Sequence, residues 1–320
     1  MRRPRKVIVA CMRNEALFLV EWIAHHLAVG FNHIVVYTND CDDGTDDLLD
    51  LMSTAFPVHH VRNPGPYKQG TIQKQALADA FRRREVRKAA WVLHIDADEY
   101  VNVRFGQRRI DDLIARYPEV DGIALMWRHF GSAGRGTWNG GSILEGFQHC
   151  EARLPVPEAG EMAAFKTMFR PSRFREMGIH TPKRPPRHHV PRIVNAAGIE
   201  LPLDCVVRRR GSGYPVTSAH CTWDNACLHH HHVKSDDLHR AKHARGDANG
   251  RNNGKREIGS PHYLASDRNE GTDASIQQLR PRARRIEAGL RAIPGLAETE
   301  ARALDQFRVL WQKPHLMAAE

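Results

Sequence analysis

The chain has 320 residues, 41% of them hydrophobic, and it carries a formal net charge of +10 at pH 7 with a pI near 9.6. These values indicate a globular protein with one large domain and an appendage. No segment approaches the roughly 20 apolar residues of a membrane span. The apolar run behind the basic start ends at Arg13, which is too short and too strand-like for a secretion signal. We therefore expect a cytoplasmic protein.

The first ninety-five residues alternate strand-like and helix-like segments. Apolar runs of strand length lie at 6–12, 34–37, 58–61 and 91–95. Between them, residues 15–29, the segment from Thr45 onward and residues 72–89 are typical of helices. This alternation predicts a parallel sheet covered by helices. Two further helices are predicted near the C-terminus, at 274–292 and 298–311.

Two carboxylates follow the last of these strands at a spacing of two. In an extended backbone residues i and i+2 point to the same face, so Asp96 and Asp98 can act on one ligand. Oxygen ligands suit Mg²⁺ or Mn²⁺, which often bridge carboxylates to the phosphates of a substrate. Ligands of open α/β sheets bind beyond the carboxyl ends of the strands. The pair predicts a metal–diphosphate site, and the alternative is an acidic loop that faces solvent.

Three motifs surround these features, at residues 9–15 (VACMRNE), 39–45 (NDCDDGT) and 94–100 (HIDADEY). Further segments at 127–132, 165–170, 178–182 and 230–246 follow in the same order. In this combination the chain resembles glycosyltransferases of the GT-A fold. It is most similar to the bacterial family-2-like branch related to glycosyltransferase family 92, over roughly residues 6 to 250. The resemblance implies a Rossmann-like, mostly parallel sheet with helices on both faces, and a C-terminal helical extension.

The same resemblance implies an activity and a donor site. The activity is the transfer of a sugar from a nucleotide-sugar donor to an acceptor hydroxyl. The donor would contact residues of the first two strand-to-helix turns, the acidic pair and a downstream lysine: Arg13, Asn14, Glu15, Asn39, Asp40, Asp96 and Lys166. Asp96 and Asp98 would hold Mn²⁺ or Mg²⁺, and His230 would complete the metal shell. The run His229–His232 leaves that histidine uncertain by one position.

Cationic side chains and a base are the remaining parts of such a site. The cations available for the leaving diphosphate are Lys166, Arg170, Lys234 and Arg245, and we select Lys234, four residues from His230. Each could equally be a solvated surface charge. Inverting displacement, which the resemblance implies, needs a carboxylate base. No Glu-Asp dipeptide follows the acidic pair, so Glu145 is the first choice, with Asp224 and Glu99 as alternatives.

The resemblance also suggests how the chain is divided. Residues 1–128 would bind the donor, and 129–260 would bind the acceptor and complete the metal site within the same catalytic domain. Residues 261–320 would form the helical extension. The expected setting is the synthesis of a bacterial surface polysaccharide or glycolipid.

The net charge predicts an anionic partner. An acidic polysaccharide, a lipid-linked phosphate or the inner face of a membrane would each use it better than one small nucleotide. The arginine runs 82–84, 208–210 and 280–285 are scattered and match no nucleic-acid module, so no nucleic acid is expected. We expect a glycan or glycolipid acceptor, with peripheral membrane contact as one use of the charge.

Two alternatives remain open at this point. Six cysteines are spread without a Cys-x-x-Cys pair and are expected to be reduced thiols. The cluster of Cys221, Cys227 and the histidine run could instead hold zinc, although its spacing matches no common zinc module. Because an obvious base is missing, the chain could also be a non-catalytic protein that binds a nucleotide or an anionic glycan.

Overall fold

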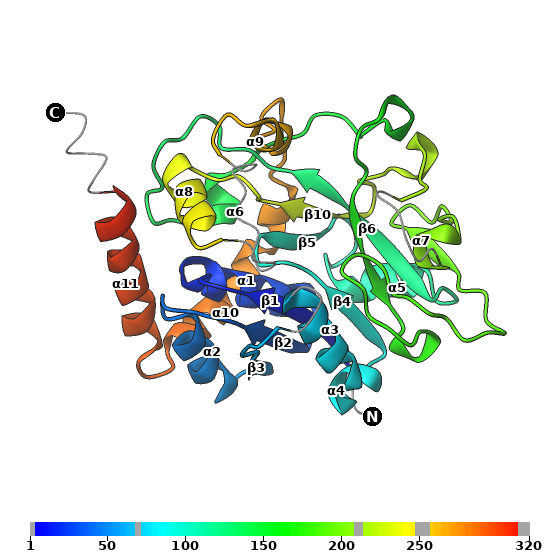
Figure 1. The fold of residues 1–320 in the computed structure, drawn as a ribbon, viewed down its shortest axis with the longest axis horizontal. Helices are drawn as coiled ribbons and strands as arrows, with labels where there is room; N and C mark the ends of the chain where they lie inside the picture. The colour runs from blue at the N-terminus through cyan, green and yellow to red at the C-terminus, as the bar shows by residue number, and fades with distance from the viewer. Residues whose placement is uncertain (1–3, 68–71, 208–213, 247–256, 313–320) are drawn as a thin grey trace.

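The computed structural model describes residues 4–67, 72–207, 214–246 and 257–312. Its first part is a run of strands and helices that alternate along the chain (Figure 1). These are β1 (Lys6–Met12), α1 (Ala16–Val29), β2 (His33–Thr38), α2 (Thr45–Ser53), β3 (Val58–Arg62), α3 (Ile72–Arg82), α4 (Arg84–Arg87) and β4 (Trp91–His94). The strands lie in the order β3-β2-β1-β4, and each neighbouring pair is parallel. The predicted parallel sheet is confirmed.

The sheet continues through strands from the middle of the chain. After β5 (Glu99–Val103) and α5 (Ile110–Arg116), these are β6 (Gly122–His129), β8 (Phe165–Phe169), β9 (Ile193–Asn195) and β10 (Ala226–His230). Within the described residues the complete order is β3-β2-β1-β4-β8-β6-β10-β5, and β9 pairs with β6. Strand β8 is antiparallel to both β4 and β6, and β5 is antiparallel to β10, whereas β6 and β10 are parallel. The sheet is therefore mostly parallel with an antiparallel insertion.

Short elements connect these strands. They are α6 (Ile143–Gly146), β7 (His149–Cys150), η1 (Pro157–Ala159), η2 (Pro171–Arg173), α7 (Asp204–Val207), η3 (Ser218–His220), α8 (Asp236–Ala244), α9 (Pro261–Ser266), β11 (Gly271–Thr272) and η4 (Ser275–Leu279). Strands β7 and β11 form a separate two-stranded pair. The arginine run 208–210 lies outside the described residues.

The core lies on both faces of the sheet. Along β1, Ile8 and Ala10 join one apolar cluster with residues of α1, and Val7 and Val9 join another with residues of α3. Alternate residues of a strand point to opposite faces, so a strand covered by helices on both sides is apolar throughout. This packing fixes the carboxyl ends of β1 and β4 beside each other.

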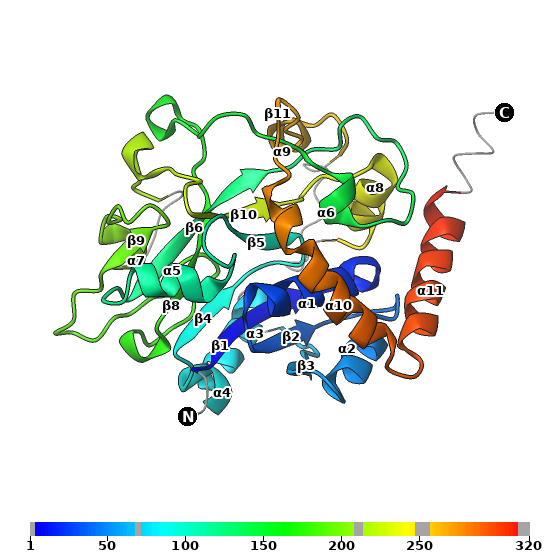
Figure 2. The ribbon, with the colours of Figure 1, turned by 180° about the vertical axis from the view of Figure 1, so that it is seen from behind.

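Two C-terminal helices pack against the rest of the described chain, α10 (Arg280–Arg291) and α11 (Leu296–Phe307), and the short π-helix η5 (Arg308–Gln312) follows them. Helix α10 crosses α1 on the back of the molecule (Figure 2). There Arg280, which is buried, pairs with Glu21 and Glu287. Helix α11 stands beside α2 at the edge of the molecule (Figure 1). The predicted extension is thus packed on the core over its described residues.

Candidate active site

The acidic pair lies where β4 ends, next to the carboxyl end of β1. The two carboxylates differ in their partners. Asp96 accepts hydrogen bonds from the Lys166 ammonium at 2.8 Å and the Gln73 amide at 3.0 Å. Burial alone would raise the pKa of Asp96, but Lys166 and His94 outweigh it and the pKa lies at about 2. Asp96 is therefore an anion over the whole physiological range.

Asp98 faces two histidines, His230 at the end of β10 and His232 just after it. Oδ1 of Asp98 is 3.6 Å from Nε2 of His230, and Oδ2 is 3.8 Å from Nδ1 of His232. One ligand atom from each of these three residues lies within 4.8 Å of the others. Because the chain stays extended here, the run separates into two faces. His229 and His231 point the other way, and both rings pack against Phe130.

The donor set suits a divalent cation. The ring nitrogens that face Asp98 are Nε2 of His230 and Nδ1 of His232, so these are the atoms that would bind a cation. The opposite nitrogens, Nδ1 of His230 and Nε2 of His232, are buried and make no hydrogen bond among the described residues. One carboxylate with two imidazoles is a mixed set, and imidazole favours transition metals over Mg²⁺. The sequence assigned His230 to this site, and the structure adds His232, which the same two-residue spacing could have indicated.

A lysine from α8 reaches the same carboxylate. The Lys242 ammonium donates to Oδ2 of Asp98 at 2.5 Å and lies 3.3 Å from Nδ1 of His232. Burial opposes ionisation of Asp98, but Lys242 and His230 hold its pKa well below the usual range. Lys242 lies 144 positions away in the chain. Nothing in its local sequence indicated this contact.

A cavity of about 380 Å³ opens over the acidic pair. Its lining includes residues from the ends of β1 and β4, from β6 and β10, and from α8. Its charged side chains and histidines include Arg13, Glu15, Asp96, Asp98, His129, His180, His230, His232, Lys242 and Arg245. This volume is at the lower end of the range for small-molecule sites. The cavity thus collects most of the predicted donor and metal residues in one place.

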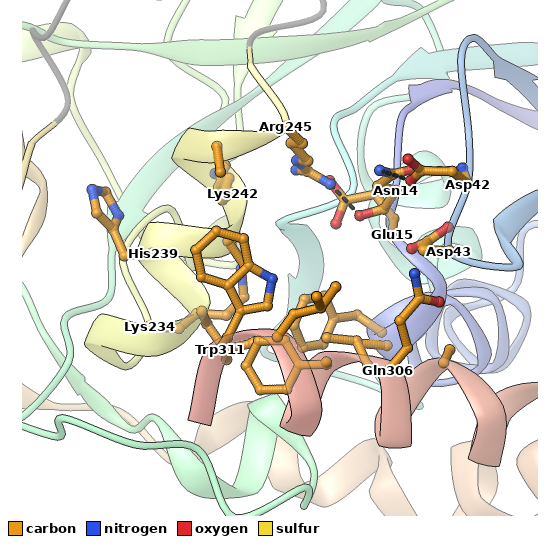
Figure 3. Close-up of a pocket in the computed structure, with 18 of the residues that line it drawn as sticks. Asn14, Glu15, Asp42, Asp43, Lys234, His239, Lys242, Arg245, Gln306 and Trp311 are labelled. Carbon is orange, nitrogen blue, oxygen red and sulfur yellow. Dashed lines mark hydrogen bonds and ion pairs between the residues drawn. The ribbon is translucent and has the colours of Figure 1, made fainter. Parts of the chain in front are cut away.

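The β1–α1 turn is held by an arginine from the far side of the cavity. The Arg245 guanidinium donates to the carbonyl oxygens of Arg13 and Asn14 and to the carboxylate of Glu15 (Figure 3). Asn14 has a φ of 52°, a left-handed conformation that asparagine tolerates. Arg245 caps the C-terminal end of α8, so it joins the first predicted donor segment to that helix.

The second predicted donor segment follows β2, the strand beside β1. Asn39 is buried and its amide donates to Asp40 at 3.1 Å. Asp40 is exposed, with a φ of 50°. Neither residue lines the cavity over the acidic pair. Their role at the donor stays a prediction.

The two selected lysines occupy different positions. Lys166 is fully buried, and its ammonium lies 2.8 Å from Asp96 and 3.7 Å from Glu99, so it would act on a donor through Asp96. Lys234 lies outside the cavity over the acidic pair and lines a neighbouring one, with its ammonium 4.8 Å from the centre of the Phe18 ring. Burial and the nearby Lys242 lower the pKa of Lys234 to about 8.

The sequence-based choices for a base lie away from this cavity. The Glu145 carboxylate accepts hydrogen bonds from Arg280 and Arg284 of α10 at 2.9 and 2.7 Å. Asp224 is exposed and precedes β10, whereas His230 ends it. A five-residue strand spans roughly 15 Å, which separates Asp224 from the acidic pair. Glu99 is fully buried behind Asp96, and burial raises its pKa well above the usual range.

The alternative zinc cluster does not form in the described part of the chain. There, the group of histidine, cysteine and acidic residues close enough to hold a metal is Asp98 with His230 and His232. Burial raises the pKa of Cys227 to about 12 and that of Cys221 to about 11. Thiols that resist ionisation in this way are poor metal ligands. No helix among the described residues is long and apolar enough to cross a membrane.

An α/β sheet with carboxylates and histidines at the carboxyl ends of its strands is the arrangement expected of a GT-A glycosyltransferase. The sequence model of glycosyltransferase family 92 matches residues 7–197 of this chain. The chain therefore belongs to glycosyltransferase family 92, and the predicted resemblance to that family is confirmed.

Individual relatives match shorter stretches. A glycosyltransferase family 92 protein of rice (Oryza sativa subsp. japonica) is 30% identical over 164 residues, which cover 49% of this chain and 26% of that protein. A family 92 protein of Ricinus communis is 28% identical over 107 residues, covering 32% of this chain and 18% of its own length. The chain thus spans about a quarter or less of these two relatives in the alignments.

Solved structures overlap only in part. Residues 1–349 of S. aureus TarS cover 52% of this chain and 47% of their own, at 14% identity and a TM-score of 0.34. The mannosyltransferase Ktr4p of S. cerevisiae covers 41% of each chain at 10% identity and a TM-score of 0.25. Overlaps of this size support no conclusion about the activity of this chain.

Proposed function

We propose that this protein transfers a sugar from a nucleotide-diphosphate sugar to an acceptor hydroxyl and that the transfer depends on a divalent cation. The observation that carries the proposal is the cluster of Asp98, His230 and His232 in a cavity at the carboxyl ends of the parallel strands. Family membership supports the reaction class. The described residues favour Mn²⁺ over Mg²⁺, because two of the three ligands are imidazoles.

The residues around the cluster would have different roles in binding the donor and stabilising the leaving diphosphate. A cation held by Asp98, His230 and His232 would neutralise the diphosphate as it leaves. Lys242 and Arg245 line the same cavity and add positive charge where negative charge develops. Lys166 keeps Asp96 ionised at the cavity floor. The backbone of the β1–α1 turn, braced by Arg245, would receive the nucleoside.

Metal-dependent nucleotide binding tests this proposal. We expect nucleoside diphosphates to raise the melting temperature with Mn²⁺ and less with Mg²⁺, and the shift to vanish in EDTA, since a ligand that binds only the folded state stabilises it. Asp98→Asn should abolish the shift, whereas Asp47→Asn, on the exposed side of α2, should retain it. A full shift in Asp98→Asn or in EDTA would contradict the metal site.

We propose Glu15 as the base that takes the proton of the acceptor hydroxyl, on the ground of its position between the two cavities. Glu15 is the carboxylate, among the described residues, that lines both the cavity over the acidic pair and the neighbouring one. We expect Glu15→Gln to lower turnover by about 10²–10⁴-fold while nucleotide binding persists, because glutamine keeps the size and the contact with Arg245 but takes no proton. Glu145→Gln, measured in the same assay, tests the sequence-based choice. Normal turnover in Glu15→Gln would exclude Glu15 as the base and leave Glu145 and Asp224 to be compared.

A second candidate function is binding without catalysis. It is favoured by the position of Glu145 and Asp224, which line neither of the two cavities. The two candidates differ in product formation. An enzyme releases nucleoside diphosphate from a nucleotide-sugar when acceptor is present, whereas a binding protein gives the thermal shift and no release.

The acceptor and the location are also proposals. The net charge of +10 suits an acidic glycan or a glycolipid of a bacterial surface polysaccharide, made at the inner face of a membrane. Co-sedimentation with anionic vesicles at low salt tests the membrane contact. Equal recovery with neutral vesicles would exclude a contact driven by charge.

A further inference from the structure

A second cavity of about 290 Å³ lies beside the first. Residues from α8 form one side of it, the β1–α1 turn and the loop after β2 form the opposite side, and α11 runs beneath (Figure 3). Four residues line both cavities: Glu15, His232, Lys242 and Arg245. A ligand in the second cavity would therefore meet a donor in the first across these side chains.

Aromatic and aliphatic side chains form much of the second cavity. They are Leu17 and Phe18 of α1, Leu238 of α8, Phe307 at the end of α11, and Leu310 and Trp311 of η5. Leu310 is 55% exposed, a large apolar side chain left uncovered at the cavity edge. Figure 3 shows the Trp311 ring between α11 and Lys242 of α8. The cavity thus offers flat apolar surface to a ligand.

One buried charge in this cavity has no anionic partner. Lys234 is 5% exposed, and in the described part of the chain its ammonium makes no hydrogen bond or ion pair. Its contact is the face of Phe18, which replaces only part of the lost hydration. Asp98 and Glu15, the carboxylates that attract it, are already paired with Lys242 and Arg245. A buried cation in this state favours a ligand that brings its own anion.

The acidic residues across the cavity do not supply that anion. The carboxylate of Asp42 accepts from the Asn14 amide at 2.5 Å. Asp43 accepts from Thr45 and from the backbone N–H of Ala16 at 2.9 Å, which satisfies the first turn of α1. Figure 3 shows both on the side opposite Lys234. The cavity is therefore polarised, with cations on the α8 side.

We infer that the second cavity is the acceptor site and that it selects an acidic sugar, with the sugar carboxylate on Lys234 and a C–H face of the ring on Trp311. The inference rests on the proposed transferase function. The volume suits one or two sugar rings and is small for a lipid chain. Lys234, α8 and α11 all lie beyond residues 7–197, so this selectivity belongs to the part of the chain outside the family match.

Binding of a matched pair of sugars tests the inference. Methyl β-D-glucuronide and the neutral methyl β-D-glucoside are titrated by calorimetry into the full chain with Mn²⁺ and a nucleoside diphosphate. We expect the glucuronide to bind at least about 10-fold more tightly, the difference that one charge-assisted hydrogen bond supplies. Lys234→Met should remove this preference, and Lys88→Met, an exposed lysine, should retain it. Trp311→Ala should weaken both sugars by a similar factor.

Each failure has a separate meaning. Nucleotide binding without any glucuronide preference would overturn the acceptor inference and leave the proposed function standing. Loss of nucleotide binding in Lys234→Met, with an unchanged melting temperature, would assign the lysine to the donor and overturn the inference. Octyl phosphate that binds through Lys234 in place of the glucuronide would show a lipid-phosphate site instead. Absence of nucleotide binding in the wild type would contradict the proposed function itself.

Discussion

At the scale of single residues, the buried charges beneath the acidic pair decide how the site holds its shape. Lys166 and Glu99 are both fully buried and lie 3.7 Å apart, and Asp96 joins them from the cavity side. Burial raises the pKa of Glu99 well above its usual range, which favours its neutral form. The charge of Lys166 is therefore compensated mainly by ionised Asp96 and less by Glu99.

This division predicts unequal effects of two substitutions. Lys166→Met should lower the free energy of unfolding by about 3 kcal/mol, because Asp96 loses the cation that compensates its burial. Glu99→Gln should cost about 1 kcal/mol or less, since glutamine resembles a neutral glutamic acid. Urea unfolding at pH 7.5 measures both. A severe loss in Glu99→Gln with a mild one in Lys166→Met would show that Glu99 is ionised.

At the scale of elements, β10 shows how one strand serves two purposes. Its C-terminal histidine run alternates between the cavity and the interior: His230 and His232 face Asp98, while Nε2 of His229 lies 2.8 Å from the Asn102 amide on β5. The period of two along a strand could have been applied to these histidines from the sequence. The sequence analysis selected His230 alone, with the register of the run uncertain by one position, and did not pair it with His232.

The sequence pattern predicted only part of the sheet order. The alternation of the first ninety-five residues predicted β1 to β4, because β1, β2 and β4 are largely apolar on both faces. Strand β3 is the weaker one, with two histidines and partly exposed side chains. Strands β8 and β10 join the same sheet from residues 165–169 and 226–230. Their partners are set by long-range packing, which local periodicity does not encode. The proposed halves 1–128 and 129–260 therefore interleave within one sheet.

At the scale of the whole molecule, buried histidines should govern the response to acid. Burial lowers the pKa of His25 to about 3 and those of His94 and His180 to about 4. Between pH 6.5 and these values the unfolded chain binds protons that the folded chain does not. Stability therefore falls as the pH decreases through that window, by about 1.4 kcal/mol per pH unit for each such histidine.

Unfolding at pH 7.5, 6.5 and 5.5 in EDTA measures this slope. We expect His25→Gln to reduce the slope by one proton, because its imidazole, 2.8 Å from the carbonyl oxygen of Val101, no longer titrates. His188→Gln, on the exposed surface, should leave the slope unchanged. Equal slopes in wild type and His25→Gln would mean that His25 is protonated in the folded chain.

The sequence by itself determined the family, the parallel first half of the sheet and the acidic pair at the end of β4. These follow from short-range rules, since apolar periodicity and a spacing of two fix which side chains share a face. Only the tertiary structure decided the partners of the pair: Lys166 under Asp96, and His232 and Lys242 on Asp98. It also showed that Lys234 lines the second cavity and not the cavity over the acidic pair. Such contacts join residues 70 to 144 positions apart, because they depend on how β8 pairs with β4 and where α8 places Lys242.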